Sequence, residues 1–230
     1  VWLELCRKSY DRLHALIPEL PFSNLWMAKQ TANRLPQGSV LHVGILNSLR
    51  AWTLFDVPQS VLSQGFVNTG GFGIDGCMSS MVGGSVARPD KLHFLVIGDL
   101  AFFYDLNAMG NRHIGRNIRI LLVNNGKGTE FRNYNHFAAR FGDDADRFMA
   151  AAGHYGNKSH QLVRHYAEDL GFEYMQATTK EEYLGHIDRF LTPEITEKPM
   201  LLEVFTDNDE ESDALKIVNH LIEDTKGKLK

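Results

Sequence analysis

Two stretches of the chain decide its fold: LHFLVIGDL at residues 92–100 and IRILLVNNGKG at residues 118–128. Each begins with an apolar run, which predicts a strand buried on both faces, and each run ends in polar residues and glycine. The segment between them, AFFYDLNAMGNRH at residues 101–113, favours a helix. Two buried strands joined by a helical crossover are typical of a parallel sheet, in which both strands end at the same edge.

The same alternation of strand and helix patterns extends along the chain. Further strand patterns occur at 40–45, 172–176 and 200–207, with a weaker one at 61–69. Helical patterns cover 1–17, 23–35 (with Ser23 as N-cap), 77–87, 159–170, 179–191 and 211–223. We therefore expect an α/β fold with a doubly wound, mainly parallel sheet and helices on both faces. Residues 129–158 follow no clean period and form the longest candidate functional loop.

The composition excludes several classes of protein. The chain has 230 residues, 43% of them hydrophobic, and a net charge of −4, which argues against nucleic acid as the main partner. No apolar run approaches the roughly 20 residues that span a membrane, and no signal peptide is visible. Two distant cysteines, Cys6 and Cys77, fit a reducing compartment better than a disulfide framework. We therefore expect a cytoplasmic protein with no membrane and no nucleic-acid partner.

Polar side chains follow both of the deciding strands. Asp99 comes after the first strand, and Asn124, Asn125 and Gly126 come after the second. Ligands bind beyond the carboxyl ends of the strands in such sheets, and hard oxygen donors suit Mg²⁺ together with phosphates. Each feature alone is more often structural, as a helix cap or an Asn-Gly turn. Their joint spacing favours a magnesium–diphosphate site.

The motifs GDL (98–100) and VNN (123–125) resemble the thiamine diphosphate signature, in which Gly-Asp and Asn-Asn pairs are separated by a helix and a strand. Longer stretches, GIDG (73–76), GDLAFFYDLNA (98–108) and LLVNNGKGTEF (121–131), resemble one family in particular. They are similar to the C-terminal cofactor-binding domain of the succinyl-enolpyruvyl-hydroxy-cyclohexene-carboxylate (SEPHCHC) synthases, the MenD family of menaquinone biosynthesis. The resemblance covers roughly residues 23–207.

This resemblance implies a set of cofactor-binding residues. Asp99 and Asn125 would ligate Mg²⁺ through their side chains, and Lys127, where glycine is usual, through its carbonyl. Ile74 would be the bulky wedge beneath a bent thiamine diphosphate, and a carbonyl at Phe72 would accept from its aminopyrimidine. The residues lining the diphosphate would be Gly98, Leu100 and Ala101.

The resemblance also implies a reaction class and partners. In NSLR (47–50), Arg50 matches an arginine near the family's substrate carboxylate, and Ser48 lies beside it. The implied enzyme is a transferase or lyase, a thiamine diphosphate-dependent decarboxylase and carboligase that takes a 2-oxo acid and an acceptor. Because the family builds its active sites between subunits, a homo-oligomer is expected.

The expected domain organisation leaves this chain incomplete as a catalyst. Residues 1–22 are interpreted as an N-terminal linker and helix, and 23–230 as the domain that binds diphosphate and magnesium. The family's activating glutamate belongs to a pyrimidine-binding domain, which no part of this chain resembles. We expect that domain on the same native polypeptide or on a partner subunit, and no activity from these 230 residues alone.

Two alternatives remain open from the sequence. Gly71, Gly73 and Gly76 form a G-x-G-x-x-G pattern, and Asp99 follows about twenty residues later, which also fits an NAD-binding Rossmann oxidoreductase domain. The other alternative is a non-catalytic binding or assembly module derived from the same fold, because a fold alone does not determine function.

Overall fold

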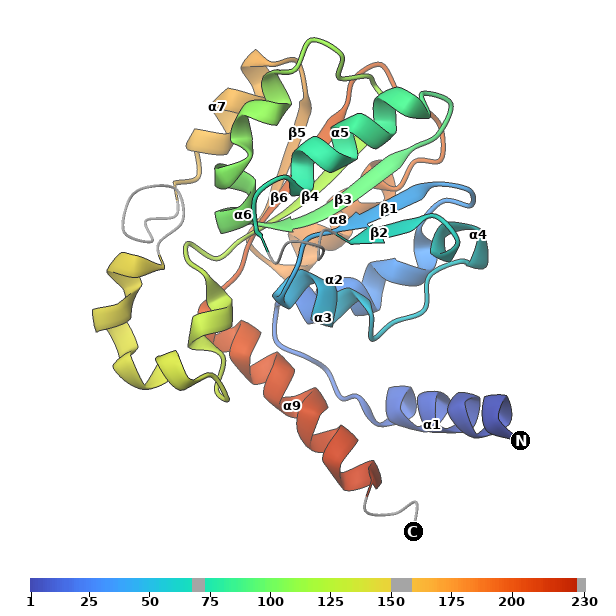
Figure 1. The fold of residues 1–230 in the computed structure, drawn as a ribbon, viewed down its shortest axis with the longest axis vertical. Coiled ribbons are helices and arrows are strands. Elements are labelled where there is room, and N and C mark those ends of the chain that lie inside the picture. The colour runs from blue at the N-terminus through green and yellow to red at the C-terminus, as the bar shows by residue number, and fades with distance from the viewer. Residues whose placement is uncertain (68–72, 150–158, 227–230) are drawn as a thin grey trace.

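A computed structural model describes residues 1–67, 73–149 and 159–226, and their six strands form one sheet (Figure 1). The strands are β1 (Val40–Val43), β2 (Gly65–Val67), β3 (His93–Gly98), β4 (Ile118–Asn124), β5 (Glu173–Ala177) and β6 (Met200–Phe205). Their order across the sheet is β2-β1-β3-β4-β6-β5, and each neighbouring pair is parallel. The prediction of a parallel sheet is confirmed.

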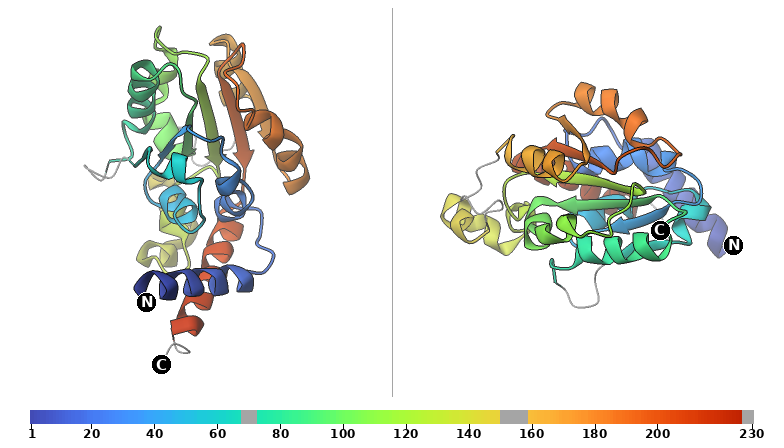
Figure 2. Two further views of the ribbon diagram at one scale, coloured as in Figure 1. Left: turned by 90° about the vertical axis from the view of Figure 1, so that its right-hand side faces the viewer. Right: turned by 90° about the horizontal axis from the view of Figure 1, so that it is seen from above.

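Helices cover both faces of the sheet, as predicted for a doubly wound fold; Figure 2 shows the sheet edge-on between them. One face is covered by α2 (Asn24–Thr31), α3 (Asn47–Trp52), α8 (Lys180–Phe190) and α9 (Asn208–Lys226). The opposite face is covered by α5 (Cys77–Ala87), α6 (Asp99–Tyr104) and α7 (Leu162–Asp169). The remaining helices are α1 (Trp2–Leu16), α4 (Gln59–Leu62) and the 3-10 segments η1 (Ala32–Arg34), η2 (Leu106–Gly110), η3 (Thr129–Arg132) and η4 (Phe137–Phe148).

The core explains why the central strands are apolar on both faces. In β4, Leu121 and Val123 pack into the cluster formed with α2, α8 and α9. Ile120 and Leu122 point the other way and pack with α5 and α7. Because side chains alternate along a strand, both sets must be apolar when helices cover both faces.

Several segments differ from their sequence patterns. The weak strand predicted at 61–69 is the short strand β2, preceded by the helix α4. The helix predicted at 101–113 is divided at Asp105, whose carboxylate accepts hydrogen bonds from the Ser79 backbone N–H and hydroxyl, both at 2.6 Å. The described part of the candidate loop at 129–158 contains η3 and η4, and α3 was not predicted. Tertiary partners decide these short elements, which sequence periodicity does not reveal.

The N-terminal segment is attached loosely and then enters the core. All fifteen residues of α1 are described, and none is buried. The helix contacts α9, and the Tyr10 hydroxyl accepts a 2.8 Å hydrogen bond from the Asp56 N–H. Ile17, Leu20 and Phe22 pack into the core, so the last part of the predicted linker belongs to the folded domain. Among the described residues, no helix is both long and apolar enough to cross a bilayer.

Candidate functional site

A cleft of about 270 Å³ lies at the carboxyl edge of the sheet, where β3 and β4 end. The two strands pair in register up to Gly98 and Val123, so the residues that follow them meet at one place. Nearly all the site residues expected from the sequence line this cleft: Ser48, Ile74, Gly98, Asp99, Leu100, Ala101, Asn125 and Lys127. Phe72 lies outside the described residues, and Arg50 lines neighbouring pockets instead.

Asp99 is a buried carboxylate that joins the two strand ends. Its Oδ1 accepts a 2.8 Å hydrogen bond from the Leu100 N–H, and its Oδ2 accepts a 2.6 Å bond from the Gly126 N–H. Burial raises the pKa of Asp99 to about 7, although these backbone donors oppose the shift. A cation beside this carboxylate would restore its charged form, because an opposite charge favours ionisation.

Asn125 presents a buried oxygen that lacks a hydrogen-bond partner among the described residues. The residue is 7% exposed, and its Oδ1 is unpaired. The backbone of the same residue is held, because its carbonyl accepts a 3.0 Å hydrogen bond from Asn208 Nδ2. An unpaired buried acceptor costs about 1–3 kcal/mol, so this oxygen is free to ligate a cation at little further cost.

Lys127 and the glycines complete this wall of the cleft. The Lys127 ammonium forms an ion pair with Asp146 of η4, so its charge is already neutralised. Its backbone carbonyl is the group that the resemblance assigns to the metal. A Cβ added at Gly98 would meet no atom within 4 Å, so open space lies beside the end of β3. A diphosphate can approach the backbone through such a space.

The donor set fits magnesium with a diphosphate. One carboxylate, one carboxamide oxygen and a backbone carbonyl are hard oxygen ligands, and phosphates and water usually complete the shell of Mg²⁺. Among the described residues, no three His, Cys, Asp or Glu side chains cluster as a metal site of their own. An ion at this edge would therefore depend on its diphosphate for part of its shell.

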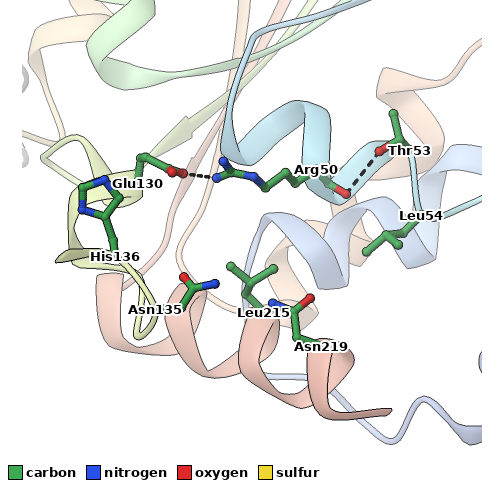
Figure 3. Close-up of a pocket in the computed structure, with 8 residues that line it drawn as sticks. All are labelled: Arg50, Thr53, Leu54, Glu130, Asn135, His136, Leu215 and Asn219. Carbon is green, nitrogen blue, oxygen red and sulfur yellow. Dashed lines mark hydrogen bonds and ion pairs between the residues drawn. The ribbon is translucent and has the colours of Figure 1, made fainter. Parts of the chain in front are cut away.

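The two substrate residues expected from the sequence lie in different places. Ser48 is buried in the wall of the cleft, where its hydroxyl accepts a 3.1 Å hydrogen bond from Asn24 Nδ2. Arg50 extends into a neighbouring pocket of about 490 Å³, where it forms an ion pair with Glu130 (Figure 3). Glu130 lines both spaces, and the rest of the larger pocket is lined by Thr53, Leu54, Asn135, His136, Leu215 and Asn219.

A second buried carboxylate stands in the wall of the cleft, and sequence reasoning missed it. Glu211 accepts hydrogen bonds from the Asn24 N–H at 3.0 and 3.1 Å and from the Thr206 hydroxyl at 2.8 Å. Burial raises the pKa of Glu211 to about 7. Asn24 also accepts a 3.0 Å hydrogen bond from the indole of Trp52. In the sequence Glu211 stands among four other acidic residues between 207 and 213, so nothing marks it as buried.

The geometry bears on the dinucleotide-binding alternative. Gly71 lies outside the described residues, while Gly76 has a φ of 78° and directly precedes α5. Asp99 opens α6, and both of its oxygens accept from backbone N–H groups at the strand ends. A ribose-binding carboxylate must instead offer its oxygens to hydroxyl groups of the cofactor. This arrangement favours the magnesium–diphosphate interpretation.

Curated relatives of the chain are 2-succinyl-5-enolpyruvyl-6-hydroxy-3-cyclohexene-1-carboxylate synthases. The protein from Phocaeicola vulgatus is 36% identical over 204 residues, which cover 89% of this chain and 35% of the relative. The protein from Bacteroides thetaiotaomicron is 33% identical over 222 residues, which cover 96% of this chain and 37% of the relative. For Christiangramia forsetii the identity is 32% over 200 residues, which cover 86% of this chain and 32% of the relative.

These similarities confirm the resemblance drawn from the motifs. The chain spans about a third of the length of the curated relatives it matches. No protein-family model matches the chain.

Proposed function

Because this chain is a domain-length relative of the 2-succinyl-5-enolpyruvyl-6-hydroxy-3-cyclohexene-1-carboxylate synthases, we propose that it binds thiamine diphosphate through a magnesium ion. It would serve as the cofactor-binding domain of a decarboxylase and carboligase of menaquinone biosynthesis. The observation that carries the proposal is the pairing of the buried Asp99 carboxylate with the unpartnered Asn125 Oδ1 in one cleft of the described chain.

The residues of the cleft divide the binding task. Asp99 and Asn125 would ligate the ion through their side chains and Lys127 through its carbonyl. Gly98, Leu100 and Ala101 would border the diphosphate, because they follow β3 at the open edge of the cleft. Ile74, which also lines the cleft, would support the bent cofactor from below. A backbone carbonyl near Phe72, outside the described residues, would accept from its aminopyrimidine.

Thiamine diphosphate, when bound, would supply the electron sink that decarboxylation of a 2-oxo acid requires. This chain would contribute binding and orientation. We place the 2-oxo acid and acceptor next to Ser48 and Arg50, because Glu130 lines both the cleft and the pocket that holds Arg50. A substrate carboxylate would have to replace Glu130 as the partner of Arg50.

We assign cofactor activation to a pyrimidine-binding domain outside these residues. Within this chain, residues 1–22 would be a linker and helix, and residues 23–230 would be the domain that binds the diphosphate. The partner would come from the same native chain or from a second subunit of a homo-oligomer. Three exposed phenylalanines of η4 support a partner surface beside the cleft: Phe137, Phe141 and Phe148.

Adding 2-oxoglutarate, Mg²⁺ and thiamine diphosphate to this chain alone should release no carbon dioxide above background.

Magnesium-dependent binding tests the proposal directly. The chain is titrated calorimetrically with thiamine diphosphate in the presence of Mg²⁺ and again with a chelator. Thiamine monophosphate is the control, because it lacks the second phosphate that shares the ion. We expect the diphosphate to bind at least about tenfold more tightly with Mg²⁺ and the monophosphate to show no such difference. Equal affinity for the diphosphate under both conditions would overturn the proposal.

A further inference from the structure

A third buried carboxylate, Glu203 of β6, lies beneath the strand end that carries Asn125. Its Oε1 accepts a 2.6 Å hydrogen bond from Asn124 Nδ2, and its Oε2 accepts a 2.6 Å bond from the Tyr174 hydroxyl. The three residues come from β4, β6 and β5, which are neighbours in the sheet. A chain of hydrogen bonds therefore crosses three strands just before the cleft.

Glu203 lies among apolar side chains, where burying a carboxylate costs free energy that packing by itself would not require. Glu203 is fully buried at 0% exposure, and Leu122 and Leu201 are among the apolar residues on its face of the sheet. Burial raises the pKa of Glu203 to about 7. An apolar side chain of similar volume would avoid the cost of removing a carboxylate from water. What a carboxylate adds is direction, because its two oxygens hold both Asn124 and Tyr174 in defined orientations.

Asn124 and Asn125 are adjacent, so their side chains point to opposite faces of the strand end. The side-chain Nδ2 of Asn124 is held by Glu203. The backbone carbonyl of Asn124 accepts a 3.2 Å hydrogen bond from the Thr206 N–H. The next two residues are held by Asn208 at the Asn125 carbonyl and by Asp99 at the Gly126 N–H. Two side-chain oxygens of the turn lack a partner among the described residues, Asn124 Oδ1 and Asn125 Oδ1. Of these two residues only Asn125 lines the cleft.

We propose that Glu203 is a positioning residue for the magnesium site: by anchoring the Asn124 amide beneath the sheet edge, it fixes the orientation in which Asn125 Oδ1 reaches the ion. Partners behind a metal ligand orient it, and their loss typically weakens metal binding by about 10–100-fold. This inference rests on the proposed function, because it concerns the same ion.

The test measures the dissociation constant of Mg²⁺ in the presence of excess thiamine diphosphate. Glu203→Leu fills the space but releases Asn124, and it should weaken Mg²⁺ binding by about tenfold or more. Glu203→Gln should restore the affinity to within about threefold of the wild type. The introduced glutamine side chain can still bond to both neighbours once the Asn124 amide turns over, because a carboxamide both donates and accepts.

A matched pair of variants separates positioning from general stability. Tyr174→Phe and Tyr183→Phe each remove one hydrogen-bonded hydroxyl, partly buried at Tyr174 and buried at Tyr183. Tyr183 pairs with Thr31 on the other face of the sheet at 2.6 Å. Both should lower the melting temperature by similar amounts. Only Tyr174→Phe should weaken Mg²⁺ binding, by about threefold, since it loosens Glu203. This pair also decides the matter if Glu203→Leu does not fold.

A double-variant cycle tests whether Glu203 acts through Asn124. If it does, Asn124→Ala combined with Glu203→Leu should weaken Mg²⁺ binding no more than either change alone. Additive losses would overturn the inference, and so would a Tyr174→Phe affinity equal to that of Tyr183→Phe. If the wild type shows no magnesium-dependent binding, the proposed function fails first and the inference with it. If the wild type binds and Glu203→Leu binds equally well, only the inference fails.

Discussion

The cleft at the strand ends and the larger pocket beside it share Glu130 but treat their charged groups in opposite ways. In the cleft, Asp99 is almost fully buried, and Asn125 Oδ1 is buried without a partner among the described residues. In the larger pocket, which has about 490 Å³ against about 270 Å³, the exposed guanidinium of Arg50 is already paired with Glu130.

The difference shows that size does not identify the stronger binding site. Buried polar groups without partners carry a free-energy cost that a suitable ligand removes, so the small cleft favours binding. An ion pair that solvent reaches, as it reaches Arg50 here, contributes only about 0–1 kcal/mol, and a ligand that uses Arg50 must first compete with Glu130. Substitutions in the two spaces test this contrast.

The largest effect is expected at Asp99. Asp99→Asn keeps the size of the side chain but removes its charge, so Mg²⁺ binding in the presence of thiamine diphosphate should weaken by about a thousandfold, roughly 4 kcal/mol. Calorimetric titration measures this loss. Asp105→Asn is the control, because it removes a carboxylate from the end of the same helix without altering the cleft. Equal losses in the two variants would contradict the assignment.

A pH effect on stability is expected from Glu211. Its pKa rises from 4.5 to about 7 on burial, so the folded state holds a proton that the unfolded state has released. The stabilisation from Glu211 is present below about pH 4.5 and is lost as the pH rises through about 7, a change on the order of 3 kcal/mol. Urea denaturation of the wild type and Glu211→Gln, compared between pH 5 and 8, measures it.

The difference between the two proteins isolates Glu211, because Asp99 and Glu203 have raised pKa values and remain in both. Glu210→Gln removes a carboxylate from the same turn of α9 and serves as the control. A stability difference between wild type and Glu211→Gln that does not change with pH would refute the prediction.

A smaller effect on metal binding is expected at Asn125, since a neutral amide contributes less to a cation than a carboxylate does. Asn125→Ala should weaken Mg²⁺ binding by about thirtyfold, roughly 2 kcal/mol. The melting temperature without Mg²⁺ should stay constant or rise, because the removed oxygen has no partner to lose among the described residues. A fall in both quantities would indicate a structural role instead.

The smallest effect is expected in the larger pocket. Glu130→Gln releases Arg50, so a carboxylate probe such as 2-oxoglutarate should bind about threefold more tightly, as expected for an ion pair whose arginine is 45% exposed. A titration followed through the NMR signal of the Arg50 side chain measures it. Asp143→Asn makes the same change in net charge nearby, next to Arg132, and should leave the affinity unchanged. Tighter binding in both variants would reflect net charge alone.

The amino-acid sequence by itself determined the parallel sheet and the edge at which the site lies. The runs at 92–97 and 118–123 are apolar except for His93 and Arg119, and they require burial on both faces. That condition allows few arrangements other than a sheet between two helix layers. Because parallel strands joined by a crossover end at one edge, Asp99 and Asn125 had to meet there. This inference needs only local pattern and topology.

Only the tertiary structure decided which other side chains join the site. Glu211 lies 187 residues from its partner Asn24, and Glu203 lies 79 residues from its partner Asn124. The sequence around Glu211 is acidic and resembles a surface segment, and the apolar run around Glu203 does not reveal which side chains it meets. The pairing of Arg50 with Glu130 likewise depends on how α3 and η3 approach each other. Burial and hydrogen bonding at such positions arise from contacts between distant segments, so they are properties of the packed molecule and not of any stretch of sequence.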